Sequence, residues 1–238
     1  MQTIDFERLQ LRAGDRFLDV GCGEGRHTIG AYLTADVDAV GVDLCEKDLQ
    51  TAQERAEGFL DTDNSNKSLT FKVANALELP FEDNSFDKVI CSEVLEHIPD
   101  YQGVLKEIDR VLKPNGVLAV SVPRAWPEEI CWRLSKEYHE VEGGHIRIFN
   151  AIQLRRDVER LGWKRYARHW AHALHVPFWW LKCAFWGKDD ESKMVQTYHK
   201  FLVWDLMKQP WITRTLEKIL DPLMGKSVVM YFVRNPQQ

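Results

Sequence analysis

The sequence has no uninterrupted apolar run long enough to cross a membrane. A membrane-spanning helix needs about 18 or more consecutive apolar residues, whereas 28% of the 238 residues are charged and they interrupt every apolar stretch. The first residues also lack the basic start and the apolar core of a secretory signal. The sequence therefore predicts a cytoplasmic protein.

Cysteine is scarce and scattered. The five cysteines are odd in number and never form a CxxC pair, so we expect neither a disulfide framework nor a zinc site built from paired cysteines. Free thiols are the prediction for all five.

The residues that are present divide the chain into two unlike halves. Residues 1–125 hold 13 Lys and Arg against 23 Asp and Glu, and the remainder holds 18 against 13, so an acidic half precedes a basic one. All nine tryptophans fall between Trp126 and Trp211. The net charge of −5 lacks the strong positive footprint of a nucleic-acid binder, so nucleic acid is not an expected partner. This asymmetry predicts different roles for the two halves.

Short apolar runs alternate with longer amphipathic segments in the first half, as in βαβ units around a parallel sheet. Residues 46–60 and 101–112 carry apolar side chains at helical spacing, and 113–116 (Lys-Pro-Asn-Gly) predicts a helix stop followed by a turn. The predicted buried strands are 16–20, 39–42, 69–73, 86–91 and 117–122.

The second half supplies the last two strands. Asn150 has the character of an N-cap for a helix through Leu161 that ends at Gly162. Strands are predicted at 163–170 and 227–233, which completes a seven-stranded, mostly parallel, doubly wound Rossmann-like α/β sheet. The connection between these strands is too long for an ordinary loop and is rich in tryptophan, so it predicts a helical aromatic insertion before the last strand.

Three glycines at alternate positions follow the first strand in 17–25, which reads Phe-Leu-Asp-Val-Gly-Cys-Gly-Glu-Gly. Such a turn lets a ligand approach the backbone, because glycine has no Cβ and tolerates positive φ. Asp43 ends the next strand, where a carboxylate can accept hydrogen bonds from two ribose hydroxyls. The pattern predicts a cofactor site with a nucleoside part.

A nicotinamide dinucleotide fits these residues less well. Its GxGxxG fingerprint would need glycine at the position of Arg26, and it needs no carboxylate at the position of Asp19. Glu24 lies within the turn, whereas a pyrophosphate favours a helix N-terminus free of anions.

In their order along the chain, the motifs resemble the class I S-adenosylmethionine-dependent methyltransferases, specifically the ubiquinone/menaquinone-methyltransferase-like (type 11 methyltransferase domain) subgroup. The resemblance covers residues 10–125 and is carried by 18–25, 43–44, 75–76, 79–87, 91–98 and 112–118. It implies S-adenosyl-L-methionine as the cofactor. The implied cofactor-binding residues are Asp19, Gly21, Cys22, Gly23, Asp43, Leu44, Asn75, Ala76 and Ser92.

Methyl transfer leaves few catalytic marks in a sequence. The enzyme must align donor and acceptor and exclude water, and a base helps only when the acceptor is a hydroxyl or a protonated amine. No Asn-Pro-Pro-Tyr or Asp-Pro-Pro-Tyr follows the fourth strand, which disfavours methylation of amino groups on nucleic-acid bases or glutamine. The candidate catalytic residues are His145, Glu93 and His97, and Arg147 is a candidate acceptor contact.

A metal-dependent alternative involves the same segment. Glu93, Glu96 and His97 would share one face if the segment were helical. The pattern resembles that of metal-assisted O-methyltransferases, in which a further histidine, here His145, completes a magnesium site. Related sequences of the subgroup carry such a Glu-His pair without metal, and we predict no metal.

The tryptophan-rich insertion leaves three interpretations open. Its aromatic side chains could form a lid over a lipid, isoprenoid, polyketide or aromatic acceptor. They could make a peripheral membrane contact, or they could pack within the lid or at a homodimer interface.

These inferences combine into one class I methyltransferase domain over residues 1–238. Its parts are a cofactor-binding core (10–125), an acceptor-side loop, helix and strand (126–170), an inserted lid or cap (171–226) and a final strand (227–238). The predicted activity is S-adenosylmethionine-dependent methyl transfer to a small hydrophobic or aromatic acceptor, with O-methylation preferred. The alternatives are a noncatalytic cofactor-binding module, a peripheral membrane or partner-binding protein on the same fold and, more weakly, an RNA methyltransferase.

Overall fold

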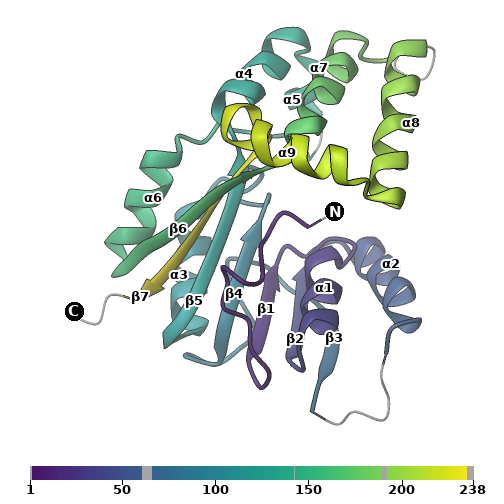
Figure 1. Cartoon of the computed structure of the whole chain (residues 1–238). Coiled ribbons are helices and arrows are strands. Elements are labelled where there is room, and N and C mark those ends of the chain that lie inside the picture. Colours follow the sequence, from purple (N-terminus) through teal and green to yellow (C-terminus); the bar gives the residue numbers. More distant parts are fainter. Residues whose placement is uncertain (1, 61–65, 142, 189–191, 235–238) are drawn as a thin grey trace.

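The computed structural model describes residues 2–60, 66–141, 143–188 and 192–234. Its centre is a seven-stranded sheet in the order β3-β2-β1-β4-β5-β7-β6 (Figure 1). Neighbouring strands among β1–β5 pair in parallel, and β7 is antiparallel to both β5 and β6. The predicted mostly parallel, doubly wound sheet is confirmed.

The elements follow the predicted pattern closely. The strands are β1 Arg16–Val20, β2 Asp38–Asp43, β3 Ser68–Val73, β4 Phe86–Ser92, β5 Leu112–Pro123, β6 Trp163–Ala171 and β7 Ser227–Arg234. The helices are α1 Arg26–Thr34, α2 Glu46–Glu57, α3 Tyr101–Val111, α4 Ala125–Leu134, α5 Glu137–Glu140, α6 Ala151–Arg160, η1 Ala173–His175, α7 Val176–Ala184, α8 Lys193–Lys208 and α9 Trp211–Met224. The end of the predicted final strand, 235–238, lies outside the described residues.

Each face of the sheet has its own apolar core, because successive side chains of a strand point to opposite faces. On one face, Leu18 and Val89 belong to a buried cluster that includes residues of α3 and α6. On the other face, Phe17 and Ile90 pack with Tyr32 of α1 and with the N-terminal segment. The helices therefore cover both faces, and the carboxyl ends of the parallel strands are left as the edge where open α/β folds bind ligands.

Two local predictions differ from the structure. The predicted turn at 113–116 is a bulge inside β5: Phe86 pairs with Leu112 and Lys88 with Val117, so the residues between leave the ladder. The stretch after β5 that was expected as a loop contains the helices α4 and α5. The predicted N-cap is confirmed, since the Asn150 side chain accepts from the backbone N–H of Ile152.

The connection between β6 and β7 is helical, as predicted, and forms η1 and α7–α9. Helices α4, α5, α7, α8 and α9, which we call the cap, gather above the sheet in Figure 1. Cys131, Tyr138 and Cys183 form a buried aromatic cluster that joins α4 and α5 to α7, with Trp132, Trp179, Trp180 and Trp186 packed against it.

No helix among the described residues is long and apolar enough to cross a membrane. All five cysteines are free thiols, as predicted.

Candidate active site

The glycine turn after β1 depends on glycine at two of its positions. Gly21 has φ +73°, and a Cβ there would lie 2.3 Å from a methyl carbon of Val94. Gly23 has φ +50° and nothing within 4 Å of the place where its Cβ would be. Positive φ and close approach both favour glycine, so the turn brings bare backbone to the carboxyl edge of the sheet.

Asp43 ends β2 beside this turn. Its carboxylate accepts hydrogen bonds from the backbone N–H of Gly23 at 2.8 Å and of Cys45 at 2.9 Å. These bonds fix the side chain and tie the glycine turn to the neighbouring strand. A carboxylate has about four acceptor positions, so capacity remains for the ribose hydroxyls that the sequence predicts there.

Asp19 lies behind the turn. Its side chain is 1% exposed and accepts a hydrogen bond from the Thr28 hydroxyl at 2.8 Å. Burial raises the pKa of Asp19 to about 7, although the bond from Thr28 acts in the opposite direction. Asp19 does not line the cavity described below, so the structure places it in support of the turn and of the start of α1.

A cavity of about 1290 Å³ opens at the carboxyl ends of β1, β2 and β4. Eight of the nine predicted cofactor-binding residues line it, all except Asp19: Gly21, Cys22, Gly23, Asp43, Leu44, Asn75, Ala76 and Ser92. Leu44 is 65% exposed, and an exposed apolar side chain next to a carboxylate suits the flat ring and sugar of a nucleoside. The residues present therefore fit S-adenosylmethionine.

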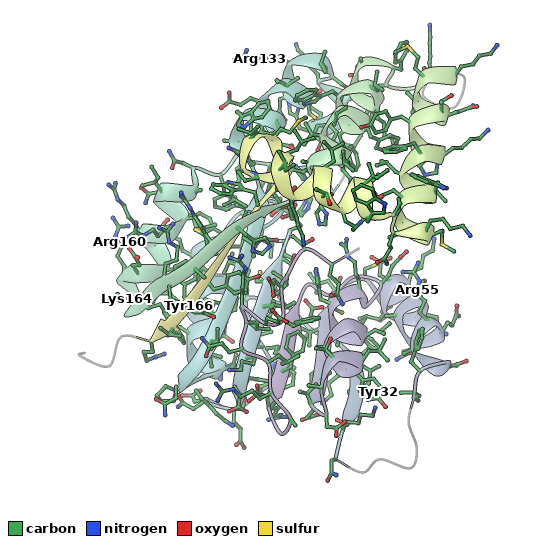
Figure 2. All side chains as sticks on the ribbon, in the orientation of Figure 1. Tyr32, Arg55, Arg133, Arg160, Lys164 and Tyr166 are labelled. Carbon is green, nitrogen blue, oxygen red and sulfur yellow. The ribbon has the colours of Figure 1, made fainter. Side chains whose placement is uncertain are left out.

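Arg55 also lines this cavity, although no sequence motif marked it. Its guanidinium lies 2.6 Å from the carboxylate of Glu24 in the glycine turn. Figure 2 labels Arg55 on α2, so the ion pair links that helix to the turn. Both side chains are about half exposed, and such a pair contributes less than about 1 kcal/mol to stability.

The segment from Glu93 to His97 is not a helix. Glu93 has φ +59°, a left-handed conformation that is uncommon outside glycine, and the following residues form turns. The condition under which Glu93, Glu96 and His97 would share one face, a helix over this segment, is therefore not met. The Glu93 carboxylate accepts from the Ser121 hydroxyl at 2.9 Å and lies 3.8 Å from Nζ of Lys226.

His97 lines the cavity next to Glu93. Its Nδ1 lies 3.2 Å from the carbonyl oxygen of Gly144. A carbonyl can only accept, so Nδ1 carries the hydrogen and Nε2 of the neutral ring keeps its lone pair. Burial lowers the pKa of His97, which favours this neutral form at neutral pH.

His145 lies behind His97 and does not line the cavity. The two rings meet edge to face with their centroids 5.0 Å apart. Nδ1 of His145 lies 2.6 Å from Oε1 of Glu128, a carboxylate that is 3% exposed. Burial acts to raise the pKa of Glu128, but the hydrogen bond and charge of His145, together with Lys226 and Trp132, hold that pKa low. Sequence reasoning missed Glu128, because no motif surrounds it.

Three of the four residues considered for a metal site do come together. Glu96, His97 and His145 offer ligand atoms within 4.8 Å of one another, and Glu93 is not part of this group. Two imidazoles and one carboxylate match magnesium poorly, since magnesium prefers oxygen ligands. Glu96 is fully buried, neither of its carboxylate oxygens has a hydrogen-bond partner among the described residues, and burial raises its pKa well above the usual range.

Arg147, a candidate acceptor contact, supports the loop instead of lining the cavity. Its guanidinium donates to the carbonyls of Leu95 at 3.3 Å and Pro99 at 2.8 Å, and it lies 4.9 Å from the ring centroid of Tyr101. These contacts hold the backbone that carries His97.

Comparison with known proteins agrees with this geometry. Residues 11–192 match the family described as a methyltransferase domain. The chain is 43% identical over 112 residues to 27-O-demethylrifamycin SV methyltransferase of Amycolatopsis mediterranei, which covers 47% of this chain and 40% of the relative. It is 37% identical over 117 residues to demethylmenaquinone methyltransferase of Lactobacillus johnsonii, covering 48% of this chain and 46% of the relative.

The matched region thus spans less than half the length of these two relatives. Among solved structures, the [4+2]-cyclase SpnF superposes with a TM-score of 0.63 at 20% identity, over 96% of this chain and 78% of SpnF. At that identity the likeness concerns the fold alone. The family match covers most of the chain, and the protein belongs to the methyltransferase domain family, in its class I ubiquinone/menaquinone-like branch.

Proposed function

We propose that this protein transfers the methyl group of S-adenosylmethionine to a small apolar or aromatic acceptor, preferably to an oxygen atom. The observation that carries the proposal is that one cavity of about 1290 Å³ is lined both by the glycine turn with Asp43 and by Glu93 with His97. Single small-molecule sites usually measure about 300–1000 Å³. The cavity therefore has room for a cofactor and an acceptor side by side.

The cofactor-binding roles follow from the positions along the cavity wall. Asp43 would hold the ribose, Leu44 and Asn75-Ala76 would border the adenine, and the glycine turn would contact the methionine part. When bound, S-adenosylmethionine supplies an electrophilic sulfonium methyl group. The chain's own contribution is to fix the two reactants in line and to keep water away.

Oxygen is the preferred acceptor atom because the cavity wall holds a base of suitable form. His97 Nε2 has a free lone pair, and the ring is fixed by the bond from Nδ1 to Gly144. We infer that His97 accepts the proton of an acceptor hydroxyl as its oxygen attacks the methyl carbon. The negative charge of Glu93 acts to raise the pKa of His97 and would stabilise the positive charge that then forms on the ring, whereas His145 acts in the opposite direction.

The wall next to His97 supports an apolar acceptor. Val94, Ile98 and Pro99, which flank His97 in the sequence, line the cavity. No described residue of 171–226 lines it, so these side chains and not the tryptophan-rich insertion support an apolar acceptor. The two relatives are named for acting on 27-O-demethylrifamycin SV and demethylmenaquinone. The comparisons favour neither a noncatalytic binding module nor an RNA methyltransferase.

The test is methyl transfer from labelled S-adenosylmethionine to a panel of lipophilic phenols and carboxylic acids, with products identified by mass spectrometry. We expect label on an acceptor oxygen. His97→Gln should lower kcat for a phenol roughly 100-fold with little change in KM, because a general base contributes about 10²–10⁴-fold. His199→Gln, at an exposed position of α8, is the matched control. Label on carbon, or an active His97→Gln variant, would contradict the proposed mechanism.

A further inference from the structure

Helix α9 presents its apolar side to solvent. Its inward positions are polar, with Thr213 and Glu217 only 6% and 8% exposed. Its outward positions recur at helical spacing and are apolar: Ile212, Leu216, Ile219 and Leu223, between 42% and 66% exposed. A helix that packs on a protein core normally has the reverse arrangement.

The polar side of α9 is used inside the molecule. Arg214 forms ion pairs with Glu217 and with Asp205 of α8, whose side chain is 1% exposed. Asp221 accepts a hydrogen bond from the backbone N–H of Ala173 at 2.9 Å. These contacts hold α9 against α8 and η1 and fix the outward orientation of its apolar side.

The exposed apolar surface continues onto the end of α8. Met207 is 74% exposed and Trp211, at the start of α9, is 76% exposed. We call the whole surface the α8–α9 face; it consists of Val203, Trp204, Leu206, Met207, Trp211, Ile212, Leu216, Ile219 and Leu223, all between 42% and 76% exposed. Contiguous apolar surfaces of this kind mark interaction sites in soluble proteins.

The exposed charged residues that α8 and α9 themselves carry have one sign. Lys200, Lys208 and Lys218 are exposed on the two helices. The acidic residues of α8 and α9 are Asp205, Glu217 and Asp221, all of which make the internal contacts just described. The face is therefore apolar and cationic without exposed anions of its own helices.

From this combination we propose that the α8–α9 face docks on the surface of an anionic phospholipid bilayer. Trp204 and Trp211 would sit at headgroup depth, the aliphatic side chains would reach the acyl boundary, and the lysines would face lipid phosphates. A second copy of the chain is a poorer occupant, since a symmetric contact would bring the same lysines together. This surface is separate from Trp179, Trp180 and Trp186, which pack in the aromatic cluster of the cap.

The experiment is flotation of the full chain with vesicles of phosphatidylcholine alone or mixed with phosphatidylglycerol. We expect binding to the mixed vesicles and little binding to phosphatidylcholine. The double variant Ile219→Ser/Leu223→Ser should lower the partition coefficient roughly tenfold or more. Lys208→Glu/Lys218→Glu should lower it by a similar factor.

Matched controls separate the α8–α9 face from general changes in polarity and charge. Leu33→Ser replaces a 54% exposed leucine on α1, and Lys106→Glu reverses an exposed lysine on α3; both should bind as the wild type does. Circular dichroism checks that every variant is folded, and light scattering after gel filtration reports its mass. Equal binding by the face and control variants, binding without anionic lipid, or a dimer that the face variants dissociate would overturn the proposal. No outcome depends on methyl transfer.

Discussion

Helices α3 and α9 are both amphipathic, but α3 buries its apolar side against the sheet and α9 exposes its apolar side to solvent. In α3 the apolar positions Val104, Leu105, Ile108 and Val111 are all buried against the sheet. In α9 the corresponding apolar positions are exposed, and its polar residues Arg214 and Asp221 contact Asp205 of α8 and the backbone of η1. An amphipathic sequence thus predicts a helix with two faces, while the neighbouring elements decide which face is covered.

The same contrast separates the core from the cap. The cofactor-binding core buries the carboxylates of Asp19 and Glu96, and the other buried side chains of its strands are mostly apolar. The cap buries Asp205 of α8 and Glu217 of α9, and it exposes leucine and isoleucine. In our proposals the core binds a small ligand, whereas the outer side of the cap contacts something larger.

The largest difference should appear between two isoleucines in these two helices. Ile108→Ala, at a fully buried position of α3, should lower the free energy of unfolding by about 2–5 kcal/mol. Ile219→Ala, at a 62% exposed position of α9, should change it by less than about 0.5 kcal/mol. Urea denaturation followed by circular dichroism measures both. Similar losses would mean that α9 packs its apolar face on the protein after all.

Cofactor affinity should depend on the core alone. Asp43→Ala removes an acceptor of ribose hydroxyls and frees the Gly23 N–H, so we expect a loss of roughly 100-fold, about 3 kcal/mol, in affinity for S-adenosylhomocysteine. Asp38→Ala, at the other end of β2, is the matched control and should bind nearly as the wild type does. Ile219→Ser should also leave the affinity unchanged. A large loss of affinity in Ile219→Ser would contradict the view that cofactor binding depends on the core and not on the cap.

Burial raises the pKa of both Asp19 in the core and Glu217 in the cap to about 7. Each group therefore binds its proton more tightly in the folded protein than in the unfolded chain, and its effect is to lower stability as pH rises from about 4 to about 7. Asp19→Asn and Glu217→Gln should each make this pH-dependent decrease in the free energy of unfolding smaller, by about 1–3 kcal/mol. Unfolding curves across this pH range test it, and an unchanged slope would show that the carboxylate is ionised and well paired in the fold.

The smallest effect is expected at the Glu128–His145 pair. The pKa of Glu128 is held low in the folded protein. Its ionised carboxylate therefore stabilises the fold at pH values above the usual pKa of a glutamate, and this stabilisation is lost as pH falls. Glu128→Gln should remove about 1 kcal/mol of stability at neutral pH and less in acid. Glu129→Gln, the exposed neighbour on α4, should have no such effect. Equal changes in both variants would refute the assignment.

The sequence predicted the strands, and eight of the nine residues that it assigned to a cofactor line one cavity, because these features depend on local patterns. Apolar runs mark buried strands, and alternate glycines mark a turn that needs glycine at Gly21, where a Cβ would lie 2.3 Å from Val94. Asp43 was predictable because the end of a parallel strand fixes where its side chain lies.

The acceptor side was harder to predict, because it depends on contacts between distant segments. The left-handed Glu93 breaks the helix that the spacing suggested. Glu128 meets His145 only because α4 packs beside the loop that carries the histidine, 17 residues further along. The outward face of α9 likewise follows from the ion pair between its Arg214 and Asp205 of α8 and not from its own periodicity.

The central claim is that the cavity at the carboxyl edge binds S-adenosylmethionine, and calorimetric titration tests it most directly. Purified protein should bind S-adenosylmethionine and S-adenosylhomocysteine with micromolar affinity and should show no heat of binding with NADH. Binding of NADH, or of none of the three ligands, would contradict the account.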